Sequence, residues 1–142
     1  MDIRQITPRY FVAPQIDAAD MPALAEAGFT LVINNRPDQE VGADQASDAM
    51  EQAARAAGLR YIANPLTMDT MTPDRQTLQR EGLESAEGKV LAYCRSGTRS
   101  TICWALSHAT DTPVDALLDA AREGGYDLSG LAPTLTAIAS RG

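Results

Sequence analysis

The sequence is poor in several residue types, and each scarcity excludes a class of protein. Its two cysteines, Cys94 and Cys103, are too few for a disulfide framework or a cysteine-based metal cluster. Lys89 is the only lysine and the net charge is −7, which argues against a surface for nucleic acids or anionic membranes. There is no apolar run near the roughly 18 residues of a transmembrane helix, and the first residues lack the apolar core of a signal peptide. We therefore expect a cytoplasmic protein that binds neither nucleic acid nor membrane, with one domain over residues 1–142.

Short apolar runs alternate with helix-forming segments along the rest of the chain. The expected strands cover residues 3–6, 10–13, 30–34, 59–64 and 89–93. The expected helices cover residues 17–27, 46–57, 72–84 and 100–109, a segment opened by residues 111–113, and a short segment after residues 132–133. This alternation predicts an α/β fold with a central, mostly parallel sheet flanked by helices. Because sites in such folds form at the carboxyl ends of strands, we expect a site where the loops after Asn34, Asn64 and Tyr93 meet.

The segment from Val90 to Ser100 predicts a reactive cysteine. An apolar strand delivers Cys94, and Gly97 allows the backbone to curl so that several N–H groups point inward. The start of the next helix and the planar fork of Arg99 add donors for an oxyanion. Such surroundings lower a thiol pKa from about 8.5 to roughly 3.5–7.5. We therefore predict that Cys94 is an ionised nucleophile and that Arg99 binds the anion. The alternatives are that Cys94 is a small residue of the core and that Arg99 is an arginine on a helix surface.

The neighbours of Cys94 and Arg99 complete the expected site. Ser100 offers a hydroxyl that can donate to the Cys94 sulfur, although a serine at a helix start is also common. The expected anion-binding loop consists of Arg95, Ser96, Gly97 and Thr98. Its backbone N–H groups line the cavity, so we expect the side chain of Arg95 to point outward at the rim.

The spacing between Cys94 and Arg99, with four residues between them, resembles that of rhodanese-type sulfurtransferases. The segment also resembles that of tyrosine and dual-specificity phosphatases, which have five residues between the cysteine and the arginine. Further blocks occur in order at residues 11–16, 25–29, 32–38 and 104–106. Together, over residues 3–110, they resemble the bacterial beta-lactamase-hydrolase-like, phosphatase-like family. Its members have a dual-specificity-phosphatase fold and are also classed as sulfur transferases, so the resemblance implies a cysteine-phosphatase-like fold with Cys94 as nucleophile.

A phosphatase also needs an acid to protonate its leaving group. In the phosphatase families this acid lies on a loop after an earlier strand, and Asp69 occupies such a loop, residues 65–71. A solvated loop aspartate is the alternative, and Asp38 is a weaker candidate at another strand end. Asp74 fits the first turn of a helix better. Arg36 is a candidate for binding substrate at the rim, or else a surface turn residue.

Two departures from the phosphatase pattern favour sulfur transfer. Most of those enzymes have a histidine before the cysteine, where this chain has Tyr93, and the shorter loop suits one persulfide sulfur better than a tetrahedral phosphate. We therefore predict first a sulfurtransferase that forms a Cys94 persulfide from a small sulfur-containing substrate and passes the sulfur to a thiol acceptor. The alternatives are a phosphatase that forms a phosphocysteine on a phosphate substrate, and a non-catalytic redox or anion sensor. None of these needs a metal or organic cofactor.

Three further residues could carry chemistry but fit structural roles better. Cys103 follows Cys94 by nine residues on the helix, more than one turn in, which favours core packing over a redox partner. His108, the only histidine, falls near a helix C-terminus, where a cation is favoured. Trp104 fits the core.

Overall fold

Strands and helices alternate along the chain, as the sequence predicts. The computed structural model describes residues 1–141. Its strands are β1 (Arg4–Gln5), β2 (Tyr10–Ala13), β3 (Phe29–Asn34), β4 (Arg60–Ala63) and β5 (Lys89–Tyr93). Its α-helices are α1 (Met21–Glu26), α2 (Ser47–Ala56), α3 (Pro73–Ser85), α4 (Thr98–His108), α5 (Val114–Glu123) and α6 (Ala132–Ala139). Short 3-10 turns lie at η1 (Ala18–Asp20), η2 (Asp38–Glu40), η3 (Ala43–Gln45) and η4 (Ser129–Leu131).

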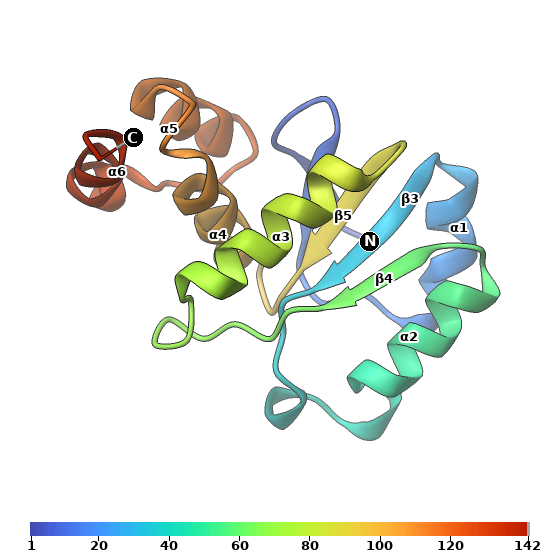
Figure 1. Ribbon diagram of the computed structural model, residues 1–142. Coiled ribbons are helices and arrows are strands. Elements are labelled where there is room, and N and C mark those ends of the chain that lie inside the picture. The colour runs from blue at the N-terminus through green and yellow to red at the C-terminus, as the bar shows by residue number, and fades with distance from the viewer. Residues whose placement is uncertain (142) are drawn as a thin grey trace.

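The strands form one five-stranded sheet in the order β1-β2-β5-β3-β4 (Figure 1). β1 pairs antiparallel with β2, and the remaining neighbours all pair in parallel. The predicted mostly parallel sheet is therefore confirmed. β5 lies in the middle of the sheet, between β2 and β3, so the loop after it leaves from the centre of the carboxyl edge.

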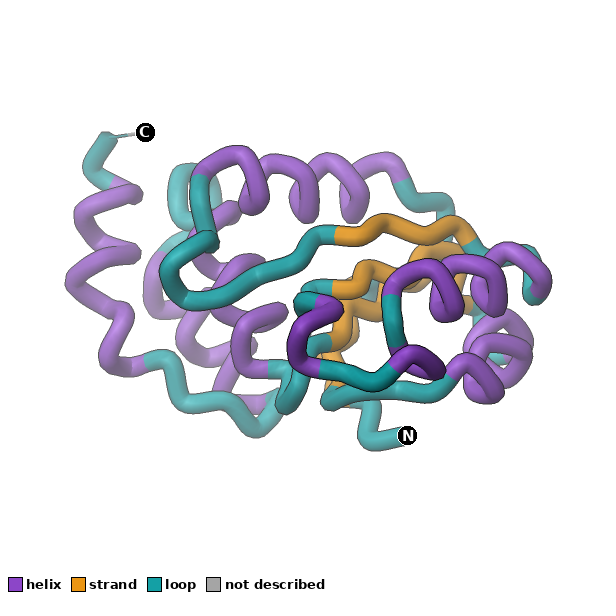
Figure 2. Tube along the Cα trace, turned by 90° about the horizontal axis from the view of Figure 1, so that it is seen from below, coloured by secondary structure: helices purple, strands orange, loops and turns teal. Residues whose placement is uncertain are grey.

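The core consists of two apolar layers, one on each face of the sheet. Helices α3 and α4 cover one face, with α5 and α6 packed beyond them against α4, while α1 and α2 cover the other face (Figures 1 and 2). Side chains of β5 alternate between the layers: Val90 and Ala92 pack in the first, Leu91 and Tyr93 in the second. A strand covered on both faces is expected to be apolar throughout, which explains the continuous run before Cys94. Burial on both faces also fixes the strand that delivers this cysteine.

Glycines end the first two helices where the sequence predicts an end. Gly28 follows α1 with a φ of +94°, and Gly58 follows α2 with a φ of +83°. Both lie in the left-handed region, which glycine adopts without a steric penalty.

Helix starts differ more from the predictions. Thr72 is the N-cap of α3, as predicted, but its side chain makes no capping hydrogen bond. Helix α4 begins at Thr98, two residues before the predicted start at Ser100. Gly97 causes this difference, since its φ of +91° turns the chain directly into the helix. Arg99 therefore lies in the first turn of α4 and not in a loop before it.

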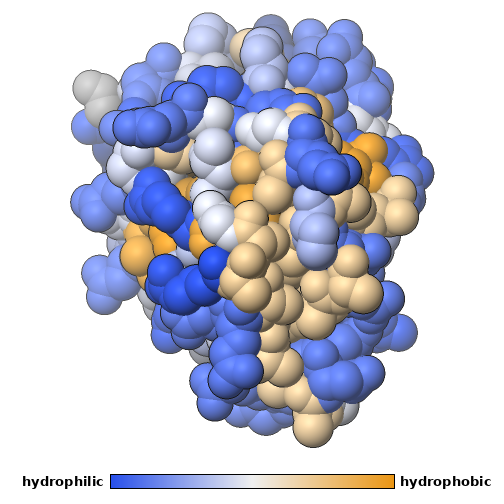
Figure 3. Space-filling model, turned by 90° about the vertical axis from the view of Figure 1, so that its right-hand side faces the viewer, coloured by the Kyte–Doolittle hydropathy of each residue, from blue (hydrophilic) through white to orange (hydrophobic). Residues whose placement is uncertain are grey.

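The surface carries few large apolar side chains. Among residues 1–141 only Met1 and Met68 are large, hydrophobic and exposed. Figure 3 shows a broad, weakly apolar area on the side where α1 and α2 lie, and these helices expose small residues such as Ala23 and Ala56. Across the described part of the chain, every helix is too short or too polar to cross a membrane.

Candidate active site

Cys94 lies where β5 ends and the turn into α4 begins. Its side chain is fully buried, and the N–H of Gly97 donates a hydrogen bond to Sγ at 3.1 Å. Gly97 is also the N-cap of α4. The sulfur therefore lies close to a backbone donor and to the positive end of a helix dipole, two features that stabilise a thiolate.

Backbone hydrogen bonds hold the exit of β5 on both sides. The N–H of Cys94 donates to the carbonyl of Ala13 in β2 at 3.3 Å. On the other side, the N–H of Asn35 donates to the carbonyl of Tyr93 at 2.8 Å. The position of the sulfur is thus set by the two neighbouring strands.

Arg99 forms a bidentate ion pair with Glu40 of η2. Its Nη1 and Nη2 donate to the two carboxylate oxygens at 2.9 and 2.7 Å, and Nη1 also donates to the carbonyl of Leu66 at 2.6 Å. The hydrogen bond that Arg99 donates to Glu40 raises the pKa of Arg99, and the charge of Cys94 raises it further, while Arg99 lowers the pKa of Glu40. The guanidinium is therefore held by Glu40 within electrostatic reach of the cysteine.

Arg36, predicted at the substrate rim, supports Glu40. Its Nε donates to Oε1 of Glu40 at 3.3 Å, and its Nη2 donates to the Glu40 carbonyl at 3.1 Å. Its Nη1 donates to Oε1 of Gln15 at 3.3 Å. Because all three nitrogens are engaged, Arg36 orients the partner of Arg99, and substrate binding by its guanidinium stays a prediction.

A set of buried polar side chains, the amide network, lies around Ser100. Nδ2 of Asn35 donates to the Ser100 hydroxyl at 2.9 Å and to Oε1 of Gln79 at 2.7 Å. Since the Ser100 oxygen accepts this hydrogen bond, its own proton is left for another acceptor. No hydrogen bond joins Ser100 to Cys94 among the described residues, so the donor role of Ser100 stays a prediction.

The amide network extends to elements beyond α4. Nε2 of Gln79 donates to the Tyr10 hydroxyl at 2.9 Å and to the Ser100 carbonyl at 3.2 Å. The Tyr10 hydroxyl donates to the same carbonyl at 2.8 Å, and Nδ2 of Asn64 donates to Oδ1 of Asn35 at 3.1 Å. Buried polar groups are costly unless they are paired. These pairings therefore fix β2, α3 and the loops after β3 and β4 relative to the start of α4.

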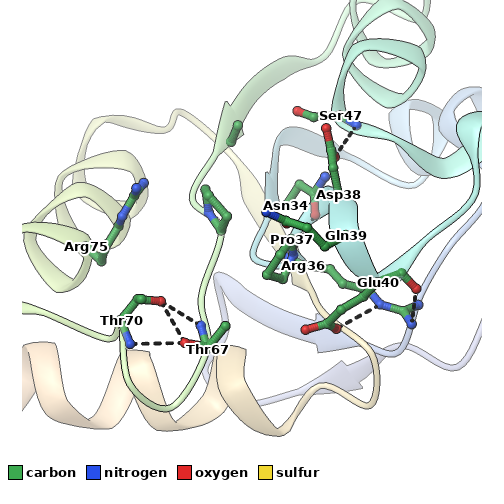
Figure 4. A pocket seen from close by; sticks show the side chains of 12 residues that line it. Asn34, Arg36, Pro37, Asp38, Gln39, Glu40, Ser47, Thr67, Thr70 and Arg75 are labelled. Carbon is green, nitrogen blue, oxygen red and sulfur yellow. Dashed lines mark hydrogen bonds and ion pairs between the residues drawn. The ribbon is translucent and has the colours of Figure 1, made fainter.

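Asp69 lies in the exposed loop between β4 and α3. Two threonines close this turn, the N–H of Thr67 donating to Oγ1 of Thr70 at 2.9 Å and the N–H of Thr70 to Oγ1 of Thr67 at 3.1 Å (Figure 4). Within residues 1–141, the Asp69 carboxylate makes no hydrogen bond or ion pair. The loop itself reaches the site, because Leu66 accepts from Arg99. The role of Asp69 as general acid stays a prediction.

A hollow of about 510 Å³ opens between the loops after β3 and β4 (Figure 4). One wall consists of Asn34, Arg36, Pro37, Asp38, Gln39, Glu40 and Ser47, and the other of Ala63, Pro65, Thr67, Thr70 and Arg75. Asp38, the weaker candidate for the acid, accepts a hydrogen bond from the N–H of Ser47 at 2.8 Å, at the start of α2. Cys94 does not line the hollow. Glu40 connects the two places, since it lines the hollow and binds Arg99.

The other side chains of the anion-binding loop face solvent. Arg95 is exposed, as expected for a side chain directed away from the cavity. The Ser96 hydroxyl donates to Oγ1 of Thr98 at 3.0 Å, and the N–H of Thr98 donates to Oγ of Ser96 at 3.4 Å. These hydroxyls brace the turn, which leaves backbone N–H groups as the candidate anion donors.

Cys103 and His108 lie apart from this site. Cys103 is fully buried in α4, and burial raises the pKa of its thiol to about 12. His108 lies in the last turn of α4, with Nδ1 2.9 Å from the carbonyl of Trp104. Cys94 precedes the opposite end of this helix. Both placements agree with the structural roles that the sequence favours.

Sequence reasoning missed Glu40, Asn35 and Gln79. Glu40 meets Arg99 across 59 positions, and Asn35 meets Ser100 across 65. The only available signal was that amide residues, Asn35 among them, directly follow strands that end at the predicted site. No feature of the sequence around Glu40 or Gln79 indicates that they belong to the site.

Comparisons with known proteins place this chain in a family. Residues 2–111 match the family described as "Beta-lactamase hydrolase-like protein, phosphatase-like domain". A Beta-lactamase hydrolase-like protein of Agrobacterium fabrum is 32% identical over 126 residues, which cover 87% of this chain and 29% of the relative. The chain thus spans less than a third of the length of the curated relatives it matches.

Solved structures share the fold. A "putative phosphatase" from Neisseria meningitidis is 28% identical, with a TM-score of 0.83 over 97% of this chain and 99% of that one. TpbA of P. aeruginosa in complex with pTyr is 16% identical, with a TM-score of 0.60 over 95% and 90%. The predicted cysteine-phosphatase-like fold is therefore confirmed. None of these proteins is named a sulfurtransferase, so they support the phosphatase alternative better than our sulfurtransferase hypothesis. The chain belongs to the family of phosphatase-like domains of Beta-lactamase hydrolase-like proteins.

Proposed function

We propose that this chain is a cysteine-dependent phosphatase that hydrolyses phosphate monoesters through a phosphocysteine at Cys94. The observation that carries the proposal is the hydrogen bond from the Gly97 N–H to the Cys94 sulfur, directly before a helix whose first turn holds Arg99. A thiolate beside a backbone donor, a helix N-terminus and a guanidinium is suited to attack on an anionic phosphoryl group. Membership of a phosphatase-like family supports the same chemistry.

In the first step, the Cys94 thiolate attacks phosphorus. An S–P bond forms while the P–O bond to the leaving group breaks, and Asp69 in its acid form gives a proton to the leaving oxygen. Arg99 and the N–H groups at the start of α4 stabilise the charge on the phosphoryl oxygens. Asp69 must approach from its exposed loop, so the loop closes over the bound substrate in this proposal.

In the second step, water hydrolyses the phosphocysteine. The water oxygen bonds to phosphorus, the S–P bond breaks, and its electron pair returns to Cys94 as the thiolate. The Asp69 carboxylate, which lost its proton in the first step, accepts the proton from water. Inorganic phosphate leaves, and both residues return to their starting forms.

We propose an aryl phosphate such as phosphotyrosine as the substrate class. The hollow beside Glu40 has the size of a small-molecule site and adjoins the loop that would bind the phosphate. Arg75 lines it and, within residues 1–141, forms no ion pair. TpbA, which shares the fold, has been crystallised with phosphotyrosine.

The short loop between Cys94 and Arg99 favours sulfur transfer as a second candidate function. Only four residues separate Cys94 from Arg99, and a smaller ring offers fewer N–H groups around a smaller space. In this reaction thiosulfate transfers its outer sulfur to the Cys94 thiolate and releases sulfite, and a thiol or cyanide then removes that sulfur.

Parallel assays of the purified chain test the proposal. We expect release of phosphate from nitrophenyl phosphate and from a phosphotyrosine peptide, loss of this activity in Cys94→Ser, and its retention in the control Cys103→Ala. Acid quenching during turnover should trap phosphate on Cys94. Turnover of thiosulfate and cyanide without any phosphate release would replace the phosphatase with the sulfurtransferase. Turnover of neither substrate by a folded chain would favour the non-catalytic sensor.

A further inference from the structure

The segment after α5 returns to the cysteine loop and places one hydroxyl against it. Tyr126 follows the two glycines that end α5, and its Oη donates to the carbonyl oxygen of Ser96 at 2.9 Å. Tyr126 lies outside residues 2–111, the part of the chain that matches the family. This contact therefore comes from a segment to which the family match assigns nothing.

The peptide group that Tyr126 holds is also the one that contacts the sulfur. The carbonyl of Ser96 and the N–H of Gly97 belong to a single planar unit. Its N–H donates to Sγ of Cys94 at 3.1 Å while its carbonyl accepts from Tyr126. Rotation of this plane would break both hydrogen bonds, so the Tyr126 contact fixes the direction of the N–H. A donor on the carbonyl also polarises the peptide and strengthens its N–H as a donor.

The absence of a side chain at Gly97 is what allows this approach. A Cβ atom at Gly97 would lie 2.1 Å from Oη and 2.8 Å from Cζ of Tyr126. The tyrosine therefore packs against a bare Cα atom. The φ of +91° at Gly97 separately favours glycine. Gly97 thus serves both the turn into α4 and the contact with the tyrosine.

Tyr126 is itself held by the end of α5. Its N–H donates to the carbonyl of Ala121 at 2.9 Å. Nη1 of Arg4, in β1, donates to the carbonyl of Gly124 at 3.4 Å. Burial raises the pKa of Tyr126 and the charge of Cys94 raises it further, so the phenol keeps the proton that it donates.

We propose that Tyr126 is a positioning residue for the nucleophile, whose hydroxyl fixes the Ser96–Gly97 peptide so that the Gly97 N–H stays on the Cys94 sulfur. The inference rests on the proposed function only in taking Cys94 as the reacting thiol. The hydroxyl acts on the thiolate before any substrate binds. Its effect should therefore appear in the reactivity of the free chain.

The test is Tyr126→Phe, which removes only the hydroxyl. Tyr61→Phe is the matched control, because the Tyr61 hydroxyl also forms a hydrogen bond, accepting from Nδ2 of Asn34, but belongs to the edge strand β4. The rate of Cys94 alkylation by iodoacetamide is measured between about pH 4 and 9 by peptide mass spectrometry. We expect the pH profile of Tyr126→Phe to move to higher pH and its alkylation near pH 6 to slow roughly fivefold, the size expected for one lost hydrogen bond. The control should match the wild type.

Circular dichroism and a melting curve accompany each variant, and Tyr126→Leu removes the hydroxyl with different packing. An unshifted pH profile in either folded variant overturns the proposal. An equal slowing in Tyr61→Phe also overturns it, because general loosening would then explain the effect. If the profile shifts as expected but the wild type hydrolyses no aryl phosphate, the proposed function fails and the role of Tyr126 stands. If hydrolysis occurs and the profile does not shift, only the role of Tyr126 fails.

Discussion

The two loops that would meet a substrate differ in how firmly they are held. In the segment after β5, which includes the first turn of α4, the Cys94 sulfur accepts a hydrogen bond, Arg99 is paired with Glu40, and Ser100 is bound to Asn35. In the loop after β4, two threonines bond to each other while Asp69 stands exposed beside the exposed Met68. The proposed nucleophile and anion site are thus preorganised, whereas the proposed proton donor is not. The first loop should set the rate by its geometry, and the second by how it closes.

The largest expected effect comes from the firmly held side. Arg99→Lys keeps the charge but loses the planar fork that binds Glu40 with two nitrogens. We expect kcat for aryl phosphate hydrolysis to fall about a hundredfold to a thousandfold, the range seen when one donor to a transition-state anion is removed. Arg95→Lys is the control, because Arg95 lies in the turn just before α4 and is exposed. Equal losses in the two variants would show that only the charge of the loop matters.

The next effect tests the loosely held side. Asp69→Asn should reduce hydrolysis of an alkyl phosphate about a hundredfold, because its leaving group needs a proton, and reduce nitrophenyl phosphate hydrolysis much less. Rates are compared across a series of leaving groups, with Asp74→Asn as control in the first turn of α3. If Asp69→Asn leaves the dependence of the hydrolysis rate on the leaving group unchanged, Asp69 is not the general acid. If Asp38→Asn instead alters the dependence of the rate on the leaving group, Asp38 would be the general acid.

The smallest effect concerns the carboxylate that holds Arg99. Arg99 lowers the pKa of Glu40, so in the folded state this group contributes stability above its unfolded pKa and loses it as the pH falls through the folded value. Glu40→Gln should therefore lower Tm by roughly 1–4 °C near pH 7, the range for a partly exposed ion pair. The difference should shrink as the pH falls below the ordinary glutamate pKa of about 4.3 and disappear only below the lowered pKa of folded Glu40.

Glu51→Gln provides the comparison for that measurement, since Glu51 forms an exposed ion pair with Arg55. Its Tm should change less than that of Glu40→Gln. A loss of Tm in Glu40→Gln that persists at low pH would mean that Glu40 acts by packing and not by its charge.

The parts of the fold and site that could be predicted are those with local causes. The apolar run that ends at Cys94 reads as a buried strand, and Gly97 with the following helix reads as a turn that collects backbone donors. Alternation of strands and helices then predicts the mostly parallel sheet. The start of α4 was misplaced because the glycine turn and the helix share residues. The first residue of α4 depends on the φ angle of Gly97, which the sequence does not give.

The parts that could not be predicted are contacts between distant segments. Glu40 has the same local pattern as any polar loop residue, and only the fold brings it to Arg99. Gln79 reads as a surface residue of a polar helix, but it is buried because Asn35 and Tyr10 pair with its amide. The prediction of sulfur transfer rests on the four residues between Cys94 and Arg99 and on Tyr93 in place of a histidine before the cysteine. These features are compatible with both reactions, and the phosphatase-like relatives support phosphoryl transfer better than sulfur transfer.

The central place of β5 has a consequence for how the molecule opens. Its exit is bonded to β2 through Cys94 and to β3 through Asn35, so a local fluctuation cannot release this strand alone. Amide hydrogens of β5 should therefore exchange with solvent only on global unfolding, while those near Thr67 and Thr70 exchange through small openings. The proposed nucleophile Cys94 thus belongs to the part of the protein that we expect to unfold last. Because Cys94 is fully buried, we expect oxidants and alkylating agents to reach it through motion of the turn between Cys94 and α4 and not through unfolding of β5.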